Sequence, residues 1–363
     1  MDVLHAEGNN MLDDFVSKYD ITSPVTEMWN TIDSNLKRIL GLVPHKFAST
    51  RFHQPWVTRK VKQLSRRKQR AYNKARSCRK PHKARLWAKY NDLKKKMQKV
   101  CKQAYNDYIN DVICPDLQSN PKRFWSHISS KRCDNNGVAP LRGPRGSIYT
   151  GSKDKANILN NQFCSVFNKD EDTTTIPDLG TPFPSINRIE VTANGVIKLL
   201  KKINPHKATG PDNIPARLLK ELADSLGPML TILYQASLDS GTLPEIWKSA
   251  TISAIFKKGD RNKPSNYRPI SLTVICCKLL EHIIHSSVMQ HFESCQILTD
   301  LQHGFRKARS CDSQLLITVD DIAHNMDDGL QTDLVLLDFS KAFDKVPHVR
   351  LLHKLQHYGI GGS

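Results

Sequence analysis

The stretch LVLLDFSKAFDKVPH, residues 334–348, carries the most informative pattern in the chain. Its first residues form a near-continuous apolar run, which is typical of a β-strand buried on both faces. The run ends in the carboxylate of Asp338. A carboxylate at the end of a buried strand is costly unless it is paired or binds a cation. Because phosphoryl transfer uses carboxylates to hold Mg²⁺ against phosphate groups, the pattern indicates a metal ligand at Asp338.

A second informative stretch lies upstream, at residues 250–272, with the sequence ATISAIFKKGDRNKPSNYRPISL. Its alternating, β-rich ends predict two strands, and the polar and basic residues between them predict the turn that joins these strands. We expect the hairpin to present Lys257, Lys258 and Arg268 on one side. A guanidinium can grip a triphosphate through two parallel hydrogen bonds, so the hairpin is predicted to bind phosphate groups.

Two further strings complete the pattern. KATGPDNIP, residues 207–215, is predicted to be a loop in which Gly210 and Pro211 shape a turn and Asp212 caps the following helix. LQHGFRKARSCDSQL, residues 301–315, leads into a helix predicted from 313 to 325. In combination, the four strings resemble the reverse transcriptases of LINE-type (non-long-terminal-repeat) retrotransposons. The resemblance is specific from residue 207 to residue 359.

The resemblance implies a catalytic role for the first of these stretches. By position, Asp338 would be a ligand of the catalytic Mg²⁺ ions, and Phe343 would be the aromatic steric gate that selects deoxynucleotides. The expected cofactor is therefore Mg²⁺. The expected partners are an RNA template, a DNA primer and deoxynucleoside triphosphates.

The resemblance also implies roles for the basic residues of the other strings. Arg268 would contact the incoming triphosphate, and Lys257 and Lys258 would be the fingers lysines. The resemblance does not distinguish which of the two lysines contacts the phosphate. Gln302 and Arg306 would contact the template or primer. Structural roles for their neighbours Gly304 and Phe305 are at least as well supported as direct contacts.

Positive charge is concentrated in one segment of the chain. Residues 59–102 contain 19 Lys and Arg and one acid, Asp92, whereas the rest of the chain holds 35 basic and 34 acidic residues. Apolar residues recur at helical spacing on both sides of Pro81, which predicts a helical hairpin. Its surface is either a solvated helix face or, as we favour, a nucleic-acid-binding face. The residues predicted to contact the nucleic-acid backbone are Arg66, Arg67, Lys68, Arg70, Lys94, Lys95 and Lys96.

The family has a second palm motif, aromatic-x-Asp-Asp, which does not follow Asp338 in these 363 residues. The pairs Asp320–Asp321 and Asp327–Asp328 precede Asp338 and are interpreted as solvated helix and turn acids. We therefore expect a reverse transcriptase fragment that is inactive by itself. One alternative is a non-catalytic nucleic-acid-binding protein that uses the basic helices. Another is an RNA-dependent RNA polymerase, which Phe343 and the loop strings argue against.

These readings predict an order of parts along the chain. We expect an N-terminal helical segment at residues 1–55, a basic helical hairpin at 56–112, a linker with short helices at 113–185, and the reverse transcriptase domain at 186–363. The predicted fold class is α/β (α+β), with polymerase fingers and a partial palm preceded by a mainly helical basic region.

Composition excludes several other classes of protein. The sequence contains no apolar run of 18 residues, so it predicts no membrane span. The acidic N-terminus is unlike a secretory signal. The nine cysteines are odd in number and form no C-x-x-C pair, which argues against a disulfide framework, a structural zinc site or a disulfide-linked partner. We expect reduced thiols and an intracellular location, in the nucleus, the cytoplasm or both.

Overall fold

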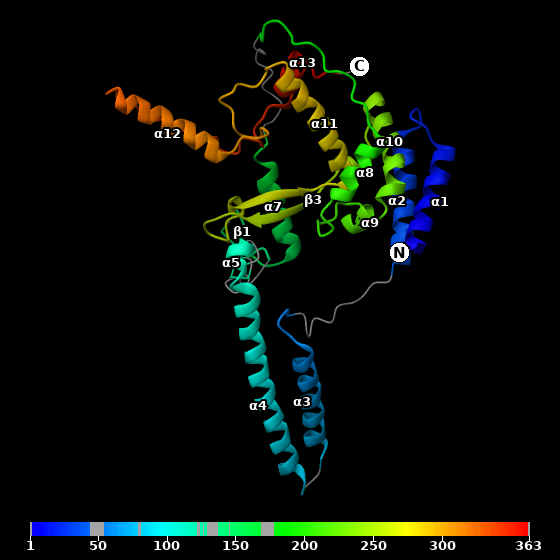
Figure 1. Cartoon of the computed structure of the whole chain (residues 1–363), viewed down its shortest axis with the longest axis vertical. Helices are drawn as coiled ribbons and strands as arrows, with labels where there is room; N and C mark the ends of the chain where they lie inside the picture. The colour runs from blue at the N-terminus through cyan, green and yellow to red at the C-terminus, as the bar shows by residue number, and fades with distance from the viewer. Residues whose placement is uncertain are drawn as a thin grey trace. The chain divides into compact units, whose positions relative to one another are not determined.

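The computed structural model describes residues 2–43, 54–78, 81–121, 124–125, 127–128, 137–144, 146–167 and 178–361. The chain forms two compact units, one of residues Met1–Val43 with Val138–Ser363 and one of residues Pro44–Gly137 (Figure 1). The first unit thus includes most of the described residues of the N-terminal segment (1–55) and of the linker (113–185) that the sequence predicts. Residues of both segments pack with its two clusters of buried apolar side chains.

The first unit is built around one helical core. It contains α1 (Asp2–Lys18), α2 (Val25–Leu42), α8 (Ala193–Lys202), α9 (Ala216–Glu221), α10 (Ala223–Ser240), the short 3-10 helix η3 (Glu245–Lys248) and the start of α11 (Ile275–Ser294). α1 and α2 both pack against α10 (Figure 1). One face of α2 lies in this core, because Trp29, Ile32, Leu36 and Ile39 are all buried.

Aromatic contacts and one buried hydrogen bond join the parts of this core. The rings of Trp29 on α2 and Trp247 on η3 meet edge to face, with centroids 5.0 Å apart. Tyr234 on α10 is fully buried and donates its hydroxyl to the carbonyl of Cys276 at 2.7 Å. A buried hydroxyl needs such an acceptor, so this bond fixes α11 against α10.

The hairpin predicted at residues 250–272 is confirmed. Strand β3 (Thr251–Phe256) pairs antiparallel with β4 (Tyr267–Leu272), and the short 3-10 helix η4 (Pro264–Asn266) precedes β4. A second, small core lies under one face of the hairpin, where Tyr267 packs with Leu141 and Leu159. These two residues come from β1 (Leu141–Arg142), which pairs with β2 (Ile148–Tyr149), and from α7 (Ser152–Cys164).

The strand predicted around residues 334–338 is wrong. Residues 330–339 form neither helix nor strand, and Leu334, Val335, Leu336 and Leu337 are 59–84% exposed. An extended segment becomes a strand only when a neighbouring strand accepts and donates its backbone hydrogen bonds, and no described segment pairs with this one. The helix predicted from 313 to 325 is confirmed as α12 (Cys311–Asp327), and α13 (His348–His357) follows the irregular segment.

The second unit contains two long helices that carry the basic residues. α3 (Arg59–Ser77) packs along α4 (Lys83–Tyr108), and α4 continues into a π-helical turn, η2 (Ile109–Ile113), and the short α5 (Asp116–Ser119) (Figure 1). The rings of Tyr72, Trp87 and Tyr90 contact one another between the two helices. In the described part of the chain, no helix has the length and apolar character needed to cross a membrane.

The loop at residues 207–215 is fixed by close contact with the end of the hairpin. A Cβ atom added to Gly210 would lie 2.6 Å from the carbonyl oxygen of Thr273 and 2.8 Å from the Cα of Val274. Both contacts are to backbone, which cannot rotate away. Glycine is therefore required here because two chain segments touch directly, and not because of a left-handed backbone.

Asp212, in the same loop, does not cap the following helix as predicted. The cap position of α9 is Pro215, which makes no side-chain cap hydrogen bond, and Asp212 is only 1% exposed. Neither carboxylate oxygen has a partner in hydrogen-bond geometry. Burial raises the pKa of Asp212 above its ordinary value, and backbone amides near the carboxyl oppose this effect only in part. The prediction was wrong because a short polar residue before a helix often caps it, whereas here the tight turn directs the Asp212 side chain into the core.

We predict that Gly210→Ala will destabilise the first unit by about 1–3 kcal/mol, as expected when a side chain is forced into a fully packed site. Urea unfolding of the full chain measures this free energy. Gly41→Ala in α2 is the matched control, because a Cβ there would meet nothing within 4 Å. The control should be neutral or stabilising, since alanine favours a helix over glycine by up to about 1 kcal/mol. Equal effects of the two changes would contradict the packing argument.

We also predict that Asp212→Asn will stabilise the chain increasingly as the pH rises. A carboxyl whose folded pKa is raised binds its proton more tightly in the native state, so the wild type loses stability as the pH rises from the unfolded pKa through the folded pKa. The variant has no such proton. Urea midpoints at pH 4 and pH 7 should therefore diverge in favour of the variant at pH 7, whereas Asp321→Asn on exposed α12 should follow the wild type. A variant that is less stable than the wild type at pH 7 would refute this.

Candidate active site

The phosphate-binding residue predicted with the most detail, Arg268, lies on the open face of the β3–β4 hairpin. Its Cα partner across the ladder is Ile255, and both residues are exposed. Side chains alternate between the two faces of a strand, so Tyr267 and Phe256 point to the opposite face, where Tyr267 is buried in the small core. The hairpin thus rests on its aromatic face and leaves the guanidinium of Arg268 to the solvent.

The two lysines after β3 differ in position. The backbone NH of Lys257 still donates to the carbonyl of Asn266 at 2.8 Å, so the ladder continues by one residue past Phe256. Alternation along this extension assigns Lys257 to the face of Ile255 and Arg268. Lys258 lies in the bend that follows and is also exposed.

Asp338 and Phe343 lie outside any sheet. Asp338 is exposed within the irregular segment described above, and Phe343 is 78% exposed. The ring of Phe343 meets the ring of Phe305 edge to face, with centroids 5.9 Å apart. This contact brings together the two strings that contain these rings, residues 301–315 and 334–348. Phe305 has a φ of 61°, a left-handed backbone that is uncommon for an aromatic residue.

The loop that carries Phe305 is anchored by its polar side chains. Arg306 donates to both carboxylate oxygens of Glu293 on α11, at 3.0 and 2.6 Å, and to the carbonyl of Thr299 at 2.8 Å. The Arg306 side chain is 7% exposed. His303 bonds Ser313, at the start of α12, at 2.8 Å. Arg306 therefore supports the loop, and its predicted contact with template or primer stays a prediction.

The Arg306–Glu293 pair also affects titration. The hydrogen bond from Arg306 holds the pKa of Glu293 below its ordinary value, and the same bond raises the pKa of Arg306. Gln302, the other predicted contact, is exposed and donates to the carbonyl of Gly304 at 3.3 Å.

In the second unit, the predicted backbone-binding residues lie along the surfaces of α3 and α4. The residues of the apolar stripe of α4 are buried or half-buried. Most of the basic side chains of α3 and α4 are exposed. Lys96 pairs with Asp92, the one acid in the segment, at 3.0 Å. The exposed members of the predicted set are Arg66, Arg67, Arg70, Lys94, Lys95 and Lys96, and Lys68 is half-buried.

The structure brings together only some of the predicted residues. Arg268 and Lys257 share one face of the hairpin, and Phe343 joins Phe305. Asp338 makes no ion pair with Arg268, and the described segments bring together no group of three or more His, Cys, Asp or Glu side chains that could hold a metal ion. The sequence interpretation missed the burial of Asp212 and a pocket at the end of α4 whose lining includes Asn106 and Asn110.

Comparison with known proteins identifies the C-terminal part of the chain. Residues 255–363 match the family model described as "Reverse transcriptase (RNA-dependent DNA polymerase)". This region begins within β3 and includes Arg268, Arg306 and Asp338.

Curated relatives extend the similarity toward the N-terminus. The chain is 26% identical over 320 residues to the probable RNA-directed DNA polymerase from transposon BS of Drosophila melanogaster, which covers 84% of this chain and 35% of the relative. It is 28% identical over 261 residues to the RNA-directed DNA polymerase from mobile element jockey of the same species, covering 70% and 28%. The chain spans about a third of the length of these relatives. These comparisons confirm the resemblance predicted from the motifs, to the reverse transcriptases of non-long-terminal-repeat retrotransposons.

Proposed function

We propose that this chain supplies the nucleotide-binding fingers and the start of the palm of an RNA-directed DNA polymerase that copies RNA into DNA. The observation that carries the proposal is the exposed guanidinium of Arg268 on the open face of a packed β-hairpin, at the start of the region that matches the reverse transcriptase model. The relatives' names describe the same activity.

The hairpin suits a triphosphate. Arg268 offers a planar guanidinium that can donate two parallel hydrogen bonds to phosphate oxygens, and Lys257 adds a second positive charge on the same face. The opposite face is packed under Tyr267, so the strands have a fixed support. Of the two candidate lysines, we therefore assign the phosphate contact to Lys257, and Lys258 to the turn.

The proposed steric gate is Phe343, with Phe305 behind it. An aromatic ring selects against a ribose 2′-hydroxyl only if the ring is held in place. The edge-to-face contact with Phe305 supplies such support, because Phe305 belongs to a loop anchored by Arg306 and His303. The exposed fraction of both rings leaves them accessible to a nucleotide.

The metal site is incomplete among the described residues. Asp338 offers one exposed carboxylate, whereas holding Mg²⁺ against phosphates takes several oxygen ligands. These residues therefore do not fit a catalytic metal site by themselves. We propose that catalysis requires further carboxylates beside Asp338, and that these 363 residues alone are inactive.

The test of the nucleotide site is binding of a fluorescent deoxynucleoside triphosphate, with an RNA template and a chain-terminated DNA primer present so that no chemistry follows. We predict that Arg268→Ala will weaken binding by more than about tenfold, the loss expected for a charge-assisted hydrogen-bonded contact. Arg268→Lys should fall between the wild type and the alanine variant, because lysine keeps the charge and loses the fork.

Arg261→Ala is the matched control. Arg261 lies in the turn of the same hairpin, but its guanidinium stacks over the ring of Phe256, 5.0 Å from the centroid, on the packed side. The control should bind the nucleotide within about twofold of the wild type, as for a charge outside the contact. Equal losses in the two alanine variants would show only a general loss of positive charge, and the proposed site would be abandoned.

We propose a second function for the second unit, the binding of single-stranded nucleic acid along α3 and α4. The observation that favours it is a surface of exposed Lys and Arg on two helices whose inner faces are closed by the contacts of Tyr72, Trp87 and Tyr90. A solvated helix needs far fewer unbalanced charges than this surface carries. The phosphates of one strand would neutralise it.

The test is the salt dependence of binding to an unstructured 12-nucleotide RNA, measured by fluorescence anisotropy on the full chain. We predict that Lys94→Ala with Lys95→Ala will lower the slope of log K against log salt by about 1.4, since each single-strand phosphate contact contributes about 0.7. The control is Lys198→Ala with Lys202→Ala, two exposed lysines on α8 of the first unit, which should leave the slope unchanged. A slope near zero for the wild type would rule out this function.

A further inference from the structure

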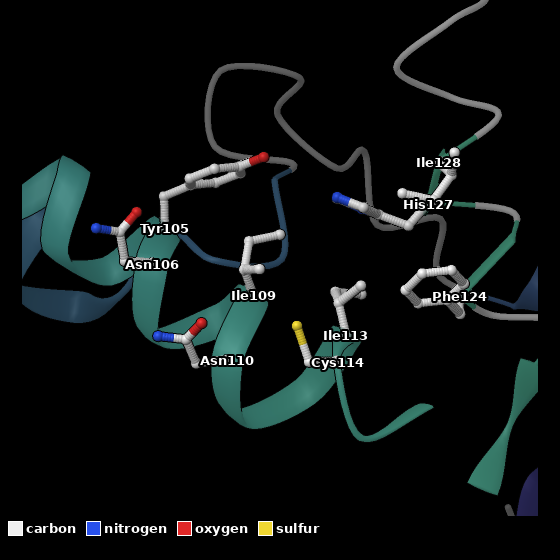
Figure 2. Close-up of a pocket in the computed structure, with 9 residues that line it drawn as sticks. All are labelled: Tyr105, Asn106, Ile109, Asn110, Ile113, Cys114, Phe124, His127 and Ile128. Carbon is white, nitrogen blue, oxygen red and sulfur yellow. The ribbon is translucent and has the colours of Figure 1, made fainter. Parts of the chain in front are cut away.

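A pocket of about 550 Å³ lies in the second unit, where α4 ends (Figure 2). This volume is within the range of pockets that bind small ligands, about 300–1,000 Å³. Figure 2 shows Tyr105 and Ile109 on one side and Phe124 and His127 on the other, with Ile113 between them. The residues that line it are Tyr105, Asn106, Ile109, Asn110, Ile113, Cys114, Phe124, His127 and Ile128.

The backbone of α4 changes its winding at this point. Residues Ile109–Ile113 form the π-helical turn η2, in which the NH of Cys114 donates to the carbonyl of Ile109 at 2.8 Å. A π-helical turn inserts an extra residue and shifts the side chains that follow, and such turns recur at functional sites. Here Ile113 is turned inward, at 2% exposure, while Asn110 stays exposed at the edge of the pocket.

The lining has the chemistry that recognises a nucleobase. Tyr105, Phe124 and His127 are half-buried aromatic side chains, and flat aromatic rings stack on unpaired bases. The rings of Tyr108 and His127 are in contact, with centroids 6.1 Å apart, which steadies the imidazole. Asn106 and Asn110 are exposed amides, each of which can both donate to and accept from the edge of a base.

A row of positive charge leads to this pocket along α4. Lys95, Lys99, Lys102 and Asn106 follow one another at spacings of four, three and four residues, so they lie on one face of the helix. All three lysines are exposed. The nearby acid Asp107 lies about 100° round the helix from Asn106 and accepts a hydrogen bond from Gln103 at 2.7 Å. A strand whose phosphates follow the lysines would therefore arrive with its bases at the pocket.

We infer that this pocket binds one unpaired base of a single-stranded nucleic acid whose phosphates lie on Lys95, Lys99 and Lys102. The inference rests on the proposed binding of nucleic acid by α3 and α4, and it adds to that binding a contact with a base. The lysines supply affinity for any sequence, whereas the rings and amides supply a contact that a bare sugar-phosphate backbone cannot make.

The first test compares two probes on the full chain, the unstructured 12-nucleotide RNA and an abasic strand of the same length. The wild type should bind the RNA roughly tenfold more tightly than the abasic strand, as expected for one stacked base. Asn106→Ala with Asn110→Ala should weaken RNA binding severalfold and leave the salt slope unchanged, because no phosphate contact is lost. Asn91→Ala with Gln98→Ala, exposed amides on α4 outside the pocket, is the matched control and should behave as the wild type.

A second measurement uses the unaltered protein, so it does not depend on the folding of a variant. Cys114 is an exposed pocket residue, and its alkylation by iodoacetamide can be followed by mass spectrometry beside that of the exposed Cys164 in the first unit. The RNA should slow alkylation of Cys114 more than the abasic strand does, and should leave Cys164 unchanged.

The outcomes separate this inference from the function on which it rests. Salt-dependent binding with equal affinity for both probes and equal protection of Cys114 would overturn the base pocket and leave nucleic-acid binding by the basic helices in place. Binding that is independent of salt would overturn both. Discrimination between the probes that is lost in the asparagine pair variant and kept in its control would establish the pocket.

Discussion

The close approach of Gly210 to the backbone of Thr273 and Val274 joins the helical core of the first unit to the end of its β-hairpin. It holds the loop at residues 207–215 against the point where β4 ends and α11 begins. Arg268 lies on β4, five residues before Thr273, which directly follows the last strand residue, Leu272. The close approach at Thr273 therefore positions the face that carries the Arg268 guanidinium relative to the helical core. The buried position of Asp212 follows from the same constraint, because the turn that brings Gly210 close also directs the next carboxyl inward.

The two parts of the proposed catalytic region differ in how they are held. Arg268 lies within a hydrogen-bonded ladder whose other face is packed, whereas Asp338 lies in an irregular, exposed segment. A site that binds phosphate needs a fixed geometry, and the paired strands with their packed opposite face can supply it. A carboxylate that must hold a metal needs the same precision, which an unpaired segment does not give. Within the described residues, the proposed nucleotide contact thus lies on a packed element, whereas the proposed metal ligand does not.

Local patterns could be predicted from the sequence, and long-range pairings could not. The stripe of α4 and the alternation around Arg268 reflect contacts between residues close in the chain, so periodicity was sufficient to predict the helix and the hairpin. The packing of α1 on α10 involves partners as distant as Asn9 and Ser225, joined by a 2.8 Å hydrogen bond, and no periodicity reports such a pairing. The apolar run at residues 334–337 had the composition of a buried strand, but a strand also requires a partner, which composition does not reveal.

Long-range pairings also decide which charged residues are free to act on a ligand, and the sequence does not reveal these pairings. Arg306 and Arg268 both lie in strings that carry the family resemblance. Arg306 donates its hydrogen bonds to Glu293 and to the carbonyl of Thr299, whereas Arg268 makes no ion pair within the described residues. Arg306 thereby anchors the loop that carries Phe305, whose ring contacts Phe343. The difference between the two arginines depends on Glu293, which lies 25 residues from Arg268 and 13 residues from Arg306 in the sequence. The fold places Glu293 beside Arg306, and the sequence alone does not show this.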